Sequence, residues 1–229
     1  MRRLLIILAV AALCATFANA AVVTLGFDTL QCYEFVGSYY AGGTGSLGSG
    51  PGPNDGITFS SNAETIPDYF HPGSCPSGNS GTNTGNMPSD PNGLFFLSGS
   101  AATMDVPAGF TTGFSFYYNA ENVPGSITVW SGLDGTGTEL ASLTLPTTGG
   151  CGTTPTFCIW DPIGVTFSGT AESVNFAGTE NQIVFDNITL GASSPGGSST
   201  TPEPATFGMI GLGISAMALV ARRRKATQR

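Results

Sequence analysis

Short apolar segments separated by turn-forming residues make up most of this chain. Between residues 21 and 190 the apolar residues show no helical period, and glycine, proline and asparagine interrupt them at short intervals. Segment 110–119 is the clearest example, because Phe114, Phe116 and Tyr118 alternate with more polar residues. Such alternation is typical of a strand that buries one face. The pattern predicts an all-β domain.

About nine or ten strands are expected, and this number of short strands favours a jelly-roll-like β-sandwich. The glycine-rich segment 132–137 is expected to be the loop of a hairpin. Two stretches rich in glycine, serine, proline and asparagine, 41–56 and 72–93, are expected to be loops that are either functional or mobile. The expected strands lie within residues 21–30, 57–61, 94–99, 110–119, 126–131, 139–145, 163–169, 173–178 and 182–190.

The N-terminal residues 1–20 have the organisation of a signal peptide. Arg2 and Arg3 precede an apolar run, and Ala18-Asn19-Ala20 is a small-x-small sequence of the kind that signal peptidase cleaves. Cleavage after Ala20 would leave an extracytoplasmic β-sandwich domain over residues 21–191. A flexible linker of serine, glycine and proline is expected over residues 192–201.

The charges are distributed very unevenly. All seven lysines and arginines lie in the two terminal segments, so residues 21–221 contain all fifteen acidic side chains and no basic side chain except His71. Phosphate neutralisation requires lysine or arginine, which excludes nucleic acid as a partner. A Schiff-base lysine and an arginine clamp for phosphoryl groups are excluded for the same reason. Calcium is the partner that such carboxylates favour, and solubility alone is the alternative explanation.

Four cysteines remain after removal of the signal peptide. An even number in an exported chain predicts two disulfides. Pairing of Cys151 with Cys158 is favoured because it closes a short loop, and it leaves Cys32 to pair with Cys75. A zinc site is the alternative, but the spacing does not suit one and His71 is the only histidine of the chain.

The C-terminal segment is expected to form a single transmembrane helix. Residues 205–221 carry no charge and are mostly alanine, glycine, isoleucine, leucine, methionine and valine. The length of this segment is at the short end for a spanning helix. The basic end 222–229, with Arg222, Arg223 and Arg224, follows at once and is expected to stay in the cytoplasm. The domain would then lie outside the inner membrane.

Residues 202–229 resemble the PEP-CTERM sorting signal of bacteria, which is also known as the ice-binding protein C-terminal domain. The resemblance rests on Pro202, Glu203 and Pro204, the apolar helix and the arginine cluster, in this order. It implies that an exosortase recognises the tail and cleaves near the motif. The protein would be anchored in the inner membrane first and then reach the cell surface or the extracellular space. Members of the family are linked to exopolysaccharide and biofilm production.

A second resemblance covers the domain itself. Residues 113–146, together with the closing segment 185–191, look like the β-sandwich common among proteins with this tail. The likeness supports the expected fold.

Two aspartates lie at comparable places in the first and last expected strands. Asp186 shares strand parity with Val184, Ile188 and Leu190, and no lysine or arginine exists in the domain to pair with it. In jelly-roll carbohydrate-binding modules the terminal strands often lie together and hold a structural calcium. Our hypothesis is that Asp28 and Asp186 contribute to one calcium site. The alternative is that each faces solvent at a strand end or a bulge.

Aromatic side chains are candidates for stacking on sugar rings. Trp130 and Tyr117 are the first candidates, because each has the polar parity of its strand, and Trp160, Tyr39 and Tyr40 could extend the platform. The alternative is that these rings belong to the core of an all-β protein.

No motif indicates catalysis. No pair of carboxylates is selected by a pattern, and His71 lies in a loop without a nucleophile motif around it. We therefore expect a non-enzymatic, exported surface or matrix protein that binds carbohydrate or acts as an adhesin in an exopolysaccharide context. A structural matrix protein without a specific ligand and a secreted glycan hydrolase are the alternatives.

Overall fold

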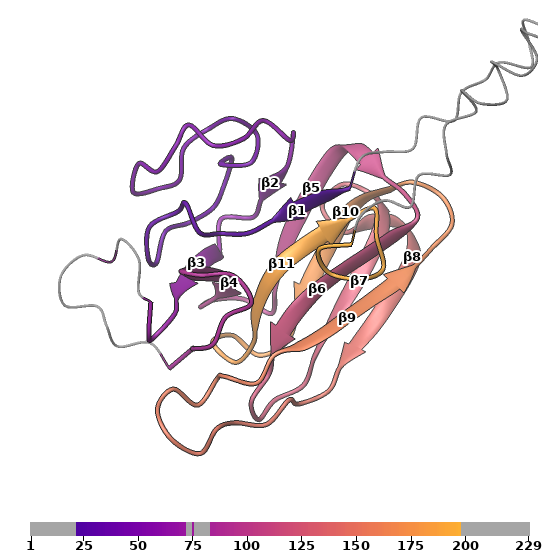
Figure 1. The fold of residues 1–229 in the computed structure, drawn as a ribbon. Helices are drawn as coiled ribbons and strands as arrows, with labels where there is room; N and C mark the ends of the chain where they lie inside the picture. The colour runs from indigo at the N-terminus through magenta and orange to yellow at the C-terminus, as the bar shows by residue number, and fades with distance from the viewer. Residues whose placement is uncertain (1–21, 72–74, 76–82, 198–229) are drawn as a thin grey trace, which may run out of the picture. The chain divides into compact units, whose positions relative to one another are not determined.

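Two antiparallel sheets pack face to face in the computed structural model, which describes residues 22–71, 75 and 83–197 (Figure 1). The described part contains no helix, and so none that is long and apolar enough to span a membrane. The prediction of an all-β sandwich is confirmed. The signal peptide, the sorting motif and the C-terminal helix that the sequence predicts lie outside the described residues.

The first sheet has six strands in the order β3-β4-β11-β6-β9, with β1 added alongside β11. The first and last strands of the domain therefore pair, with Val23 opposite Leu190. The strands are β1 (Val23–Leu25), β3 (Ala63–Pro67), β4 (Asn92–Phe96), β6 (Gly113–Asn119), β9 (Asp161–Thr166) and β11 (Val184–Leu190).

The second sheet has five strands in the order β2-β5-β10-β7-β8. Its β7–β8 hairpin closes through residues 133–135, as the glycine-rich segment predicts. The strands are β2 (Thr58–Phe59), β5 (Ala101–Phe110), β7 (Gly125–Gly132), β8 (Thr136–Leu145) and β10 (Ala171–Ala177).

Phenylalanines from both sheets meet in the core between them. Phe114 and Phe116 of β6 and Phe185 of β11 are fully buried, as is Phe176 of β10 in the other sheet. The rings of Phe176 and Phe185 lie 5.0 Å apart in an edge-to-face arrangement. Each buried ring contributes on the order of 1.5–3 kcal/mol relative to exposure. The alternation predicted for residues 110–119 is thus confirmed for its inward-facing rings.

Strands β3 and β5 are not expected from the sequence, and segment 110–119 is not one continuous strand. Strand β5 carries Asp105 and Pro107, which obscure the alternation of its buried residues. It ends at Phe110, and β6 begins at Gly113 after Thr112, which has a positive φ of 75°. A side chain at Gly113 would lie 2.8 Å from the backbone of residues 192 and 193. Glycine at this position therefore allows the segment that follows β11 to pass close to the start of β6.

A buried carboxylate orders the glycine-rich stretch 41–56. Glu34 is fully buried, and its Oε1 atom accepts hydrogen bonds from the backbone N–H groups of Leu47 (2.7 Å) and Ser49 (3.1 Å). Its Oε2 atom accepts one from the N–H of Gln31 at 2.7 Å. Burial by itself would raise the pKa of Glu34. The hydrogen bonds outweigh this effect and hold the pKa below its usual value. The stretch is a loop, as expected, and Glu34 holds it in place.

Both predicted disulfides are present. The Cα atoms of Cys32 and Cys75 are 5.0 Å apart, and those of Cys151 and Cys158 are 6.2 Å apart. Each bond restricts the unfolded chain and is worth roughly 2–4 kcal/mol of stability.

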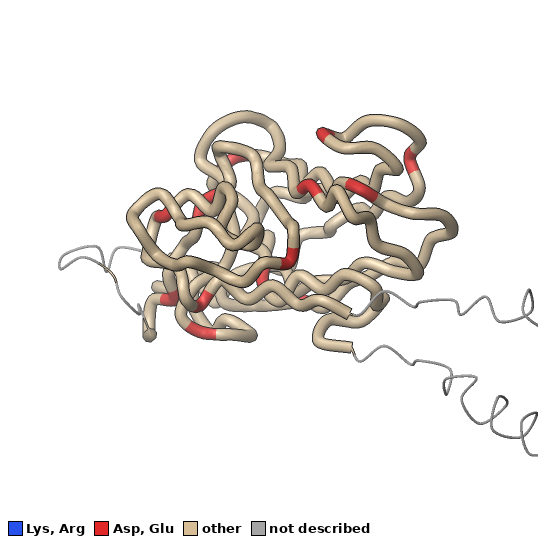
Figure 2. Tube along the Cα trace, turned by 90° about the horizontal axis from the view of Figure 1, so that it is seen from above, with Lys and Arg blue, Asp and Glu red and all other residues tan. Residues whose placement is uncertain are grey.

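The described residues carry acidic groups and no lysine or arginine (Figure 2). Glu34, Asp68 and Asp186 are fully buried in this setting. Because no cation from lysine or arginine is available, backbone N–H groups and hydroxyls bind these carboxylates instead.

Candidate functional site

The outer face of the six-stranded sheet carries a second apolar cluster, separate from the core. It contains Ile66 of β3, Phe95 of β4 and Val184 of β11, together with Met87 from the loop before β4. Tyr33 packs against them and is half-buried. Phe95 points outward because its neighbours in β4, Leu94 and Phe96, belong to the core.

A cavity of about 260 Å³ opens beside this cluster. We call it the outer-face pocket. Aromatic rings, apolar side chains and amides line it, and none of its residues is charged. The lining consists of Tyr33, Ile66, Asn83, Thr84, Phe95, Leu97, Phe157, Asn181, Gln182 and Val184.

Two aromatic rings of the pocket have a defined orientation. The ring centroids of Tyr33 and Phe95 are 6.3 Å apart, and the ring planes make an angle of 63°. Phe95 is almost fully buried. Burial, and secondly the charge of Glu64, raises the pKa of Tyr33, so its hydroxyl keeps its proton at neutral pH. The pocket therefore offers an apolar surface next to a hydrogen-bond donor.

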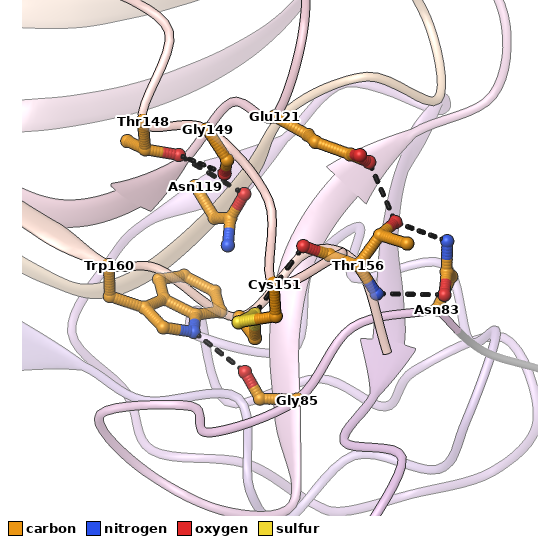
Figure 3. The surroundings of a disulfide bond; sticks show 10 residues. Asn83, Gly85, Asn119, Glu121, Thr148, Gly149, Cys151, Thr156 and Trp160 are labelled. Atoms are coloured by element: carbon orange, nitrogen blue, oxygen red, sulfur yellow. Dashed lines mark hydrogen bonds between the residues drawn. A yellow bond between two sulfur atoms is a disulfide. The ribbon is translucent and has the colours of Figure 1, made fainter. Parts of the chain in front are cut away.

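One wall of the pocket is formed by two loops that are hydrogen-bonded to each other. The N–H of Phe157 donates to the carbonyl of Asn83 at 2.9 Å, and the N–H of Gly85 donates to the carbonyl of Phe157 at 2.8 Å. The side-chain amide of Asn83 pairs with the backbone and hydroxyl groups of Thr156. Trp160 Nε1 donates to the carbonyl of Gly85 at 2.9 Å (Figure 3).

The disulfide between Cys151 and Cys158 closes the loop that carries Phe157. Inside this loop, the hydroxyl of Thr156 donates to Glu121 Oε2 at 2.6 Å (Figure 3). The wall is thus fixed by a covalent bond and by polar contacts on either side of Phe157. These contacts restrain the backbone on either side of Phe157, which lines the pocket.

The lining also includes two amide side chains from the turn between β10 and β11. Asn181 is exposed and has a positive φ of 58°, and Gln182 is half-buried. Neither amide group makes a hydrogen bond with another described residue. Both therefore keep donors and acceptors available for a ligand.

The two aspartates predicted to share a site do lie together. The terminal strands pair, and Ser89 from the loop before β4 contacts the carboxylate of Asp186. Its N–H donates to Oδ2 at 2.7 Å and its hydroxyl donates to Oδ1 at 2.9 Å. The N–H of Asn187 also donates to Oδ1, at 2.6 Å. Burial raises the pKa of Asp186 to about 7. The hydrogen bonds oppose this rise in pKa, and the nearby charge of Asp28 adds to it.

Asp28 is the less satisfied member of the pair. Its Oδ1 atom is buried and has no hydrogen-bond partner among the described residues. Burial raises its pKa, against the opposing effect of the backbone of Asn92 and the side chain of Ser89. Oxygen atoms of Asp28, Ser89 and Asn187 all lie within 4 Å of one point beside Gly26. Four oxygen-bearing side chains, from Asp28, Asp186, Ser89 and Asn187, therefore gather here.

The parity expected for Asp186 is wrong in one respect. Val184 and Asp186 lie on the outer face, but Ile188 and Leu190 lie in the core. A bulge between Asp186 and Thr189 reverses the alternation, and Asn187 in this bulge has a positive φ of 49°. Asp186 does lie at a bulge, as the alternative hypothesis states, but it is fully buried and does not face solvent.

The structure does not bring the expected stacking residues together. Trp130 lies in β7 of the five-stranded sheet, whereas Tyr117 lies in β6 of the other sheet, opposite Asp186. Tyr39 and Tyr40 are buried in the core in edge-to-face contact. Trp160 packs against the outer apolar cluster. These five rings therefore cannot form one platform.

The sequence does not predict a further polar cluster, which is formed by Asp68, His71 and Asp90. Ligand atoms of Asp68, His71 and Asp90 lie within 4.8 Å of one another, with His71 Nδ1 3.1 Å from Asp90 Oδ2. The buried Asp68 carboxylate accepts hydrogen bonds from the N–H groups of Phe70, His71 and Met87. Through these hydrogen bonds, Asp68 fixes the turn at residues 69–71.

Sequence reasoning does not identify the outer-face pocket. Its residues come from the loop after β1, from β3, β4 and β11, and from four further loops. No local pattern marks such a set. The one available signal is the outward-facing Phe95 in a strand whose other large residues face the core.

Comparison with known proteins identifies the tail. Residues 200–225 match the PEP-CTERM protein-sorting motif, as the resemblance implies. No protein in a set of curated sequences matches the chain.

Several solved structures have a remotely similar fold. A family 6 carbohydrate-binding module is 20% identical over 58% of this chain and 85% of its own, with a TM-score of 0.35. CBM35 from Paenibacillus barcinonensis is 18% identical over 60% and 94%, with a TM-score of 0.34. An arabinoxylan arabinofuranohydrolase of glycoside hydrolase family 43 from Bacillus subtilis is 19% identical over 58% of this chain and 25% of its own, with a TM-score of 0.37. Similarity this remote says nothing about what the present chain binds.

Proposed function

We propose that this protein is an exported surface or extracellular-matrix protein that binds carbohydrate in the outer-face pocket. The PEP-CTERM motif at residues 200–225 implies export and sorting at the membrane. An exosortase-type enzyme would process the tail, and the domain would meet extracellular polysaccharide. Binding without catalysis is the activity that the described residues support.

The observation that carries the proposal is the composition of the pocket. The apolar faces of sugar rings pack on aromatic side chains, and their hydroxyl groups need hydrogen-bonding partners. Tyr33 and Phe157 supply half-buried rings, Phe95 lies almost fully buried in the wall, and Asn181 and Gln182 supply amide groups that have no protein partner among the described residues. A few polar groups set in an apolar, preformed cavity are typical of small-ligand sites.

Binding of the folded domain to a panel of purified polysaccharides and oligosaccharides tests this function. Phe157→Ala should weaken binding about ten-fold or more, because the loss of one stacked ring costs on the order of 1.4 kcal/mol. The backbone hydrogen bonds of residue 157 are retained in this variant. Leu133→Ala, at an exposed site on the β7–β8 hairpin, serves as the control.

Trp130 of the five-stranded sheet is the alternative stacking residue that the sequence suggests. The variant Trp130→Ala therefore distinguishes binding there from binding in the outer-face pocket. If binding is lost in Trp130→Ala and kept in Phe157→Ala, the pocket assignment is wrong. If the wild-type protein binds no glycan, the remaining role is that of a structural matrix protein without a specific ligand.

A structural calcium ion held by Asp28 and Asp186 is proposed in addition. The supporting observation is the buried Asp28 Oδ1 atom, which lacks a partner. Ser89 has a single hydroxyl proton and lies against both carboxylates, so a cation or an extra proton is needed to balance them. Calcium binds through carboxylate, hydroxyl and amide oxygens, which are the groups gathered here.

Thermal unfolding with and without calcium tests this site. Millimolar calcium should raise Tm by several degrees in the wild-type protein and not in Asp186→Asn. An unchanged wild-type Tm would rule the site out.

A further inference from the structure

We infer that the outer-face pocket selects uncharged sugar rings and rejects uronic acids and other anionic sugars. The inference rests on the proposed carbohydrate binding and names the ligand class of that same site.

The polar groups of the pocket suit neutral hydroxyl groups. The lining offers the hydroxyl of Tyr33 and the amides of Asn181 and Gln182. Amides and hydroxyls both donate and accept, so they match sugar hydroxyls, which do the same. A sugar carboxylate placed among them would lose its hydration without gaining a cation.

No cation is available to receive an anionic sugar. Every lysine and arginine of the chain lies before residue 4 or after residue 221, so no segment of the domain carries one. His71 is the only imidazole, and it lies between Asp68 and Asp90. Recognition of sugar carboxylates commonly uses arginine or lysine, which form the strong charge-assisted hydrogen bonds.

Two carboxylates are linked to residues of the pocket instead. Glu64 lies opposite Phe95 in the β3–β4 ladder, and its charge reaches the Tyr33 hydroxyl. Glu121 accepts a hydrogen bond from Thr156, which is bonded to Asn83 of the wall. An anionic sugar would therefore meet charges of its own sign.

The size of the pocket limits the ligand to a short sugar segment. Its volume of about 260 Å³ lies just below the range of roughly 300–1,000 Å³ that is usual for pockets of drug-sized ligands. Part of the ring that enters would be enclosed. A charge on the enclosed part of that ring would lose hydration.

Matched sugars that differ only at C6 test the inference. Affinities of the wild-type domain for glucose- and glucuronate-terminated oligosaccharides, and for the galactose and galacturonate pair, are measured by titration calorimetry. A chelator is included so that calcium cannot bridge protein and sugar. The neutral member of the recognised pair should bind at least ten-fold more tightly at low salt, and added salt should narrow the difference.

Two variants test the electrostatic cause. Glu64→Gln should reduce the neutral-to-acidic affinity ratio at least three-fold, whereas Glu139→Gln, an exposed change in β8 of the other sheet, should leave the ratio unchanged. An unchanged ratio in Glu64→Gln, or equal binding of both sugars by the wild-type protein, overturns the inference. Absence of binding to either member of every pair overturns the proposed carbohydrate binding instead.

Discussion

Asp186 and Glu34 show how the same chemical group behaves differently at two buried positions. Both are fully buried, and both carboxylates accept three or more hydrogen bonds. The pKa of Glu34 is lowered, because the hydrogen bonds outweigh burial. The pKa of Asp186 is raised, because burial outweighs the hydrogen bonds and Asp28 adds a like charge. Asp186 therefore resists ionisation unless a cation joins it.

The titration of Asp186 predicts how stability depends on pH when calcium is absent. Its pKa is about 7 in the folded protein, against 3.8 for an unperturbed aspartate, the value that applies to the unfolded chain. Between these values the folded state binds more protons, so the free energy of unfolding falls as pH rises. The contribution of this one group is up to about 4 kcal/mol.

Denaturant unfolding from pH 4 to pH 8 in the presence of a chelator measures this effect. Asp186→Asn should flatten the decline, and Glu139→Gln, an exposed carboxylate change, should follow the wild-type curve. Parallel curves for the wild-type protein and Asp186→Asn would contradict the prediction. Calcium should restore wild-type stability at the high end of the range, because it favours the ionised pair.

At the scale of elements, the loops on the outer face are bonded to one another as well as to the strands. Residues 83–91 supply Asn83 to the pocket wall and Ser89 to the aspartate pair. The loop closed by Cys151 and Cys158 supplies Phe157 and is bonded to Asn83 and Gly85. Disturbing either loop should therefore alter the pocket while the sandwich remains folded.

Replacing both Cys151 and Cys158 with serine tests this dependence. Sugar affinity should fall about ten-fold, because Phe157 loses the covalent restraint that orients it. The loss of stability should be only roughly 2–3 kcal/mol, the amount expected for closure of so short a loop. The measurements are titration calorimetry and thermal unfolding. A lower Tm with unchanged affinity would show that the disulfide stabilises the protein without shaping the pocket.

At the scale of the whole molecule, the folded domain and the sorting segment are separate parts of the chain. The described residues between 22 and 197 belong to one compact unit. The PEP-CTERM motif occupies residues 200–225, outside this unit. Folding of the domain and sorting of the protein should therefore be separable by mutation.

Deleting residues 202–229 is expected to change location and leave the domain intact. The shortened protein should unfold at the wild-type Tm and bind sugar with unchanged affinity, but it should no longer be retained and processed at the membrane. Cell fractionation and intact mass measure both properties. Arg222→Ser, Arg223→Ser and Arg224→Ser combined form a smaller change in the same segment. Unchanged location and mass in the deletion would contradict a sorting role.

Some features of the protein are readable from local pattern and residue content alone. The alternation of Phe114, Phe116 and Tyr118 identifies a strand with one buried face, because side chains of a strand point to opposite sides in turn. The even cysteine count predicts both disulfides, and the order of Pro202-Glu203-Pro204, apolar run and arginines identifies the tail. The absence of basic residues from the domain predicts that it does not bind nucleic acid, whatever the fold.

The tertiary structure alone decided the location of the pocket and the face on which Asp186 lies. Phe95, Phe157 and Gln182 are distant in sequence and meet only because strand pairing and loop contacts bring their segments together. The bulge at Asn187 reverses the alternation of buried side chains along β11. The sequence pattern does not reveal such a bulge, because nothing in it marks Asn187 as having a left-handed backbone conformation. Local pattern reports which residues alternate, but the register of the sheet decides which of them meet.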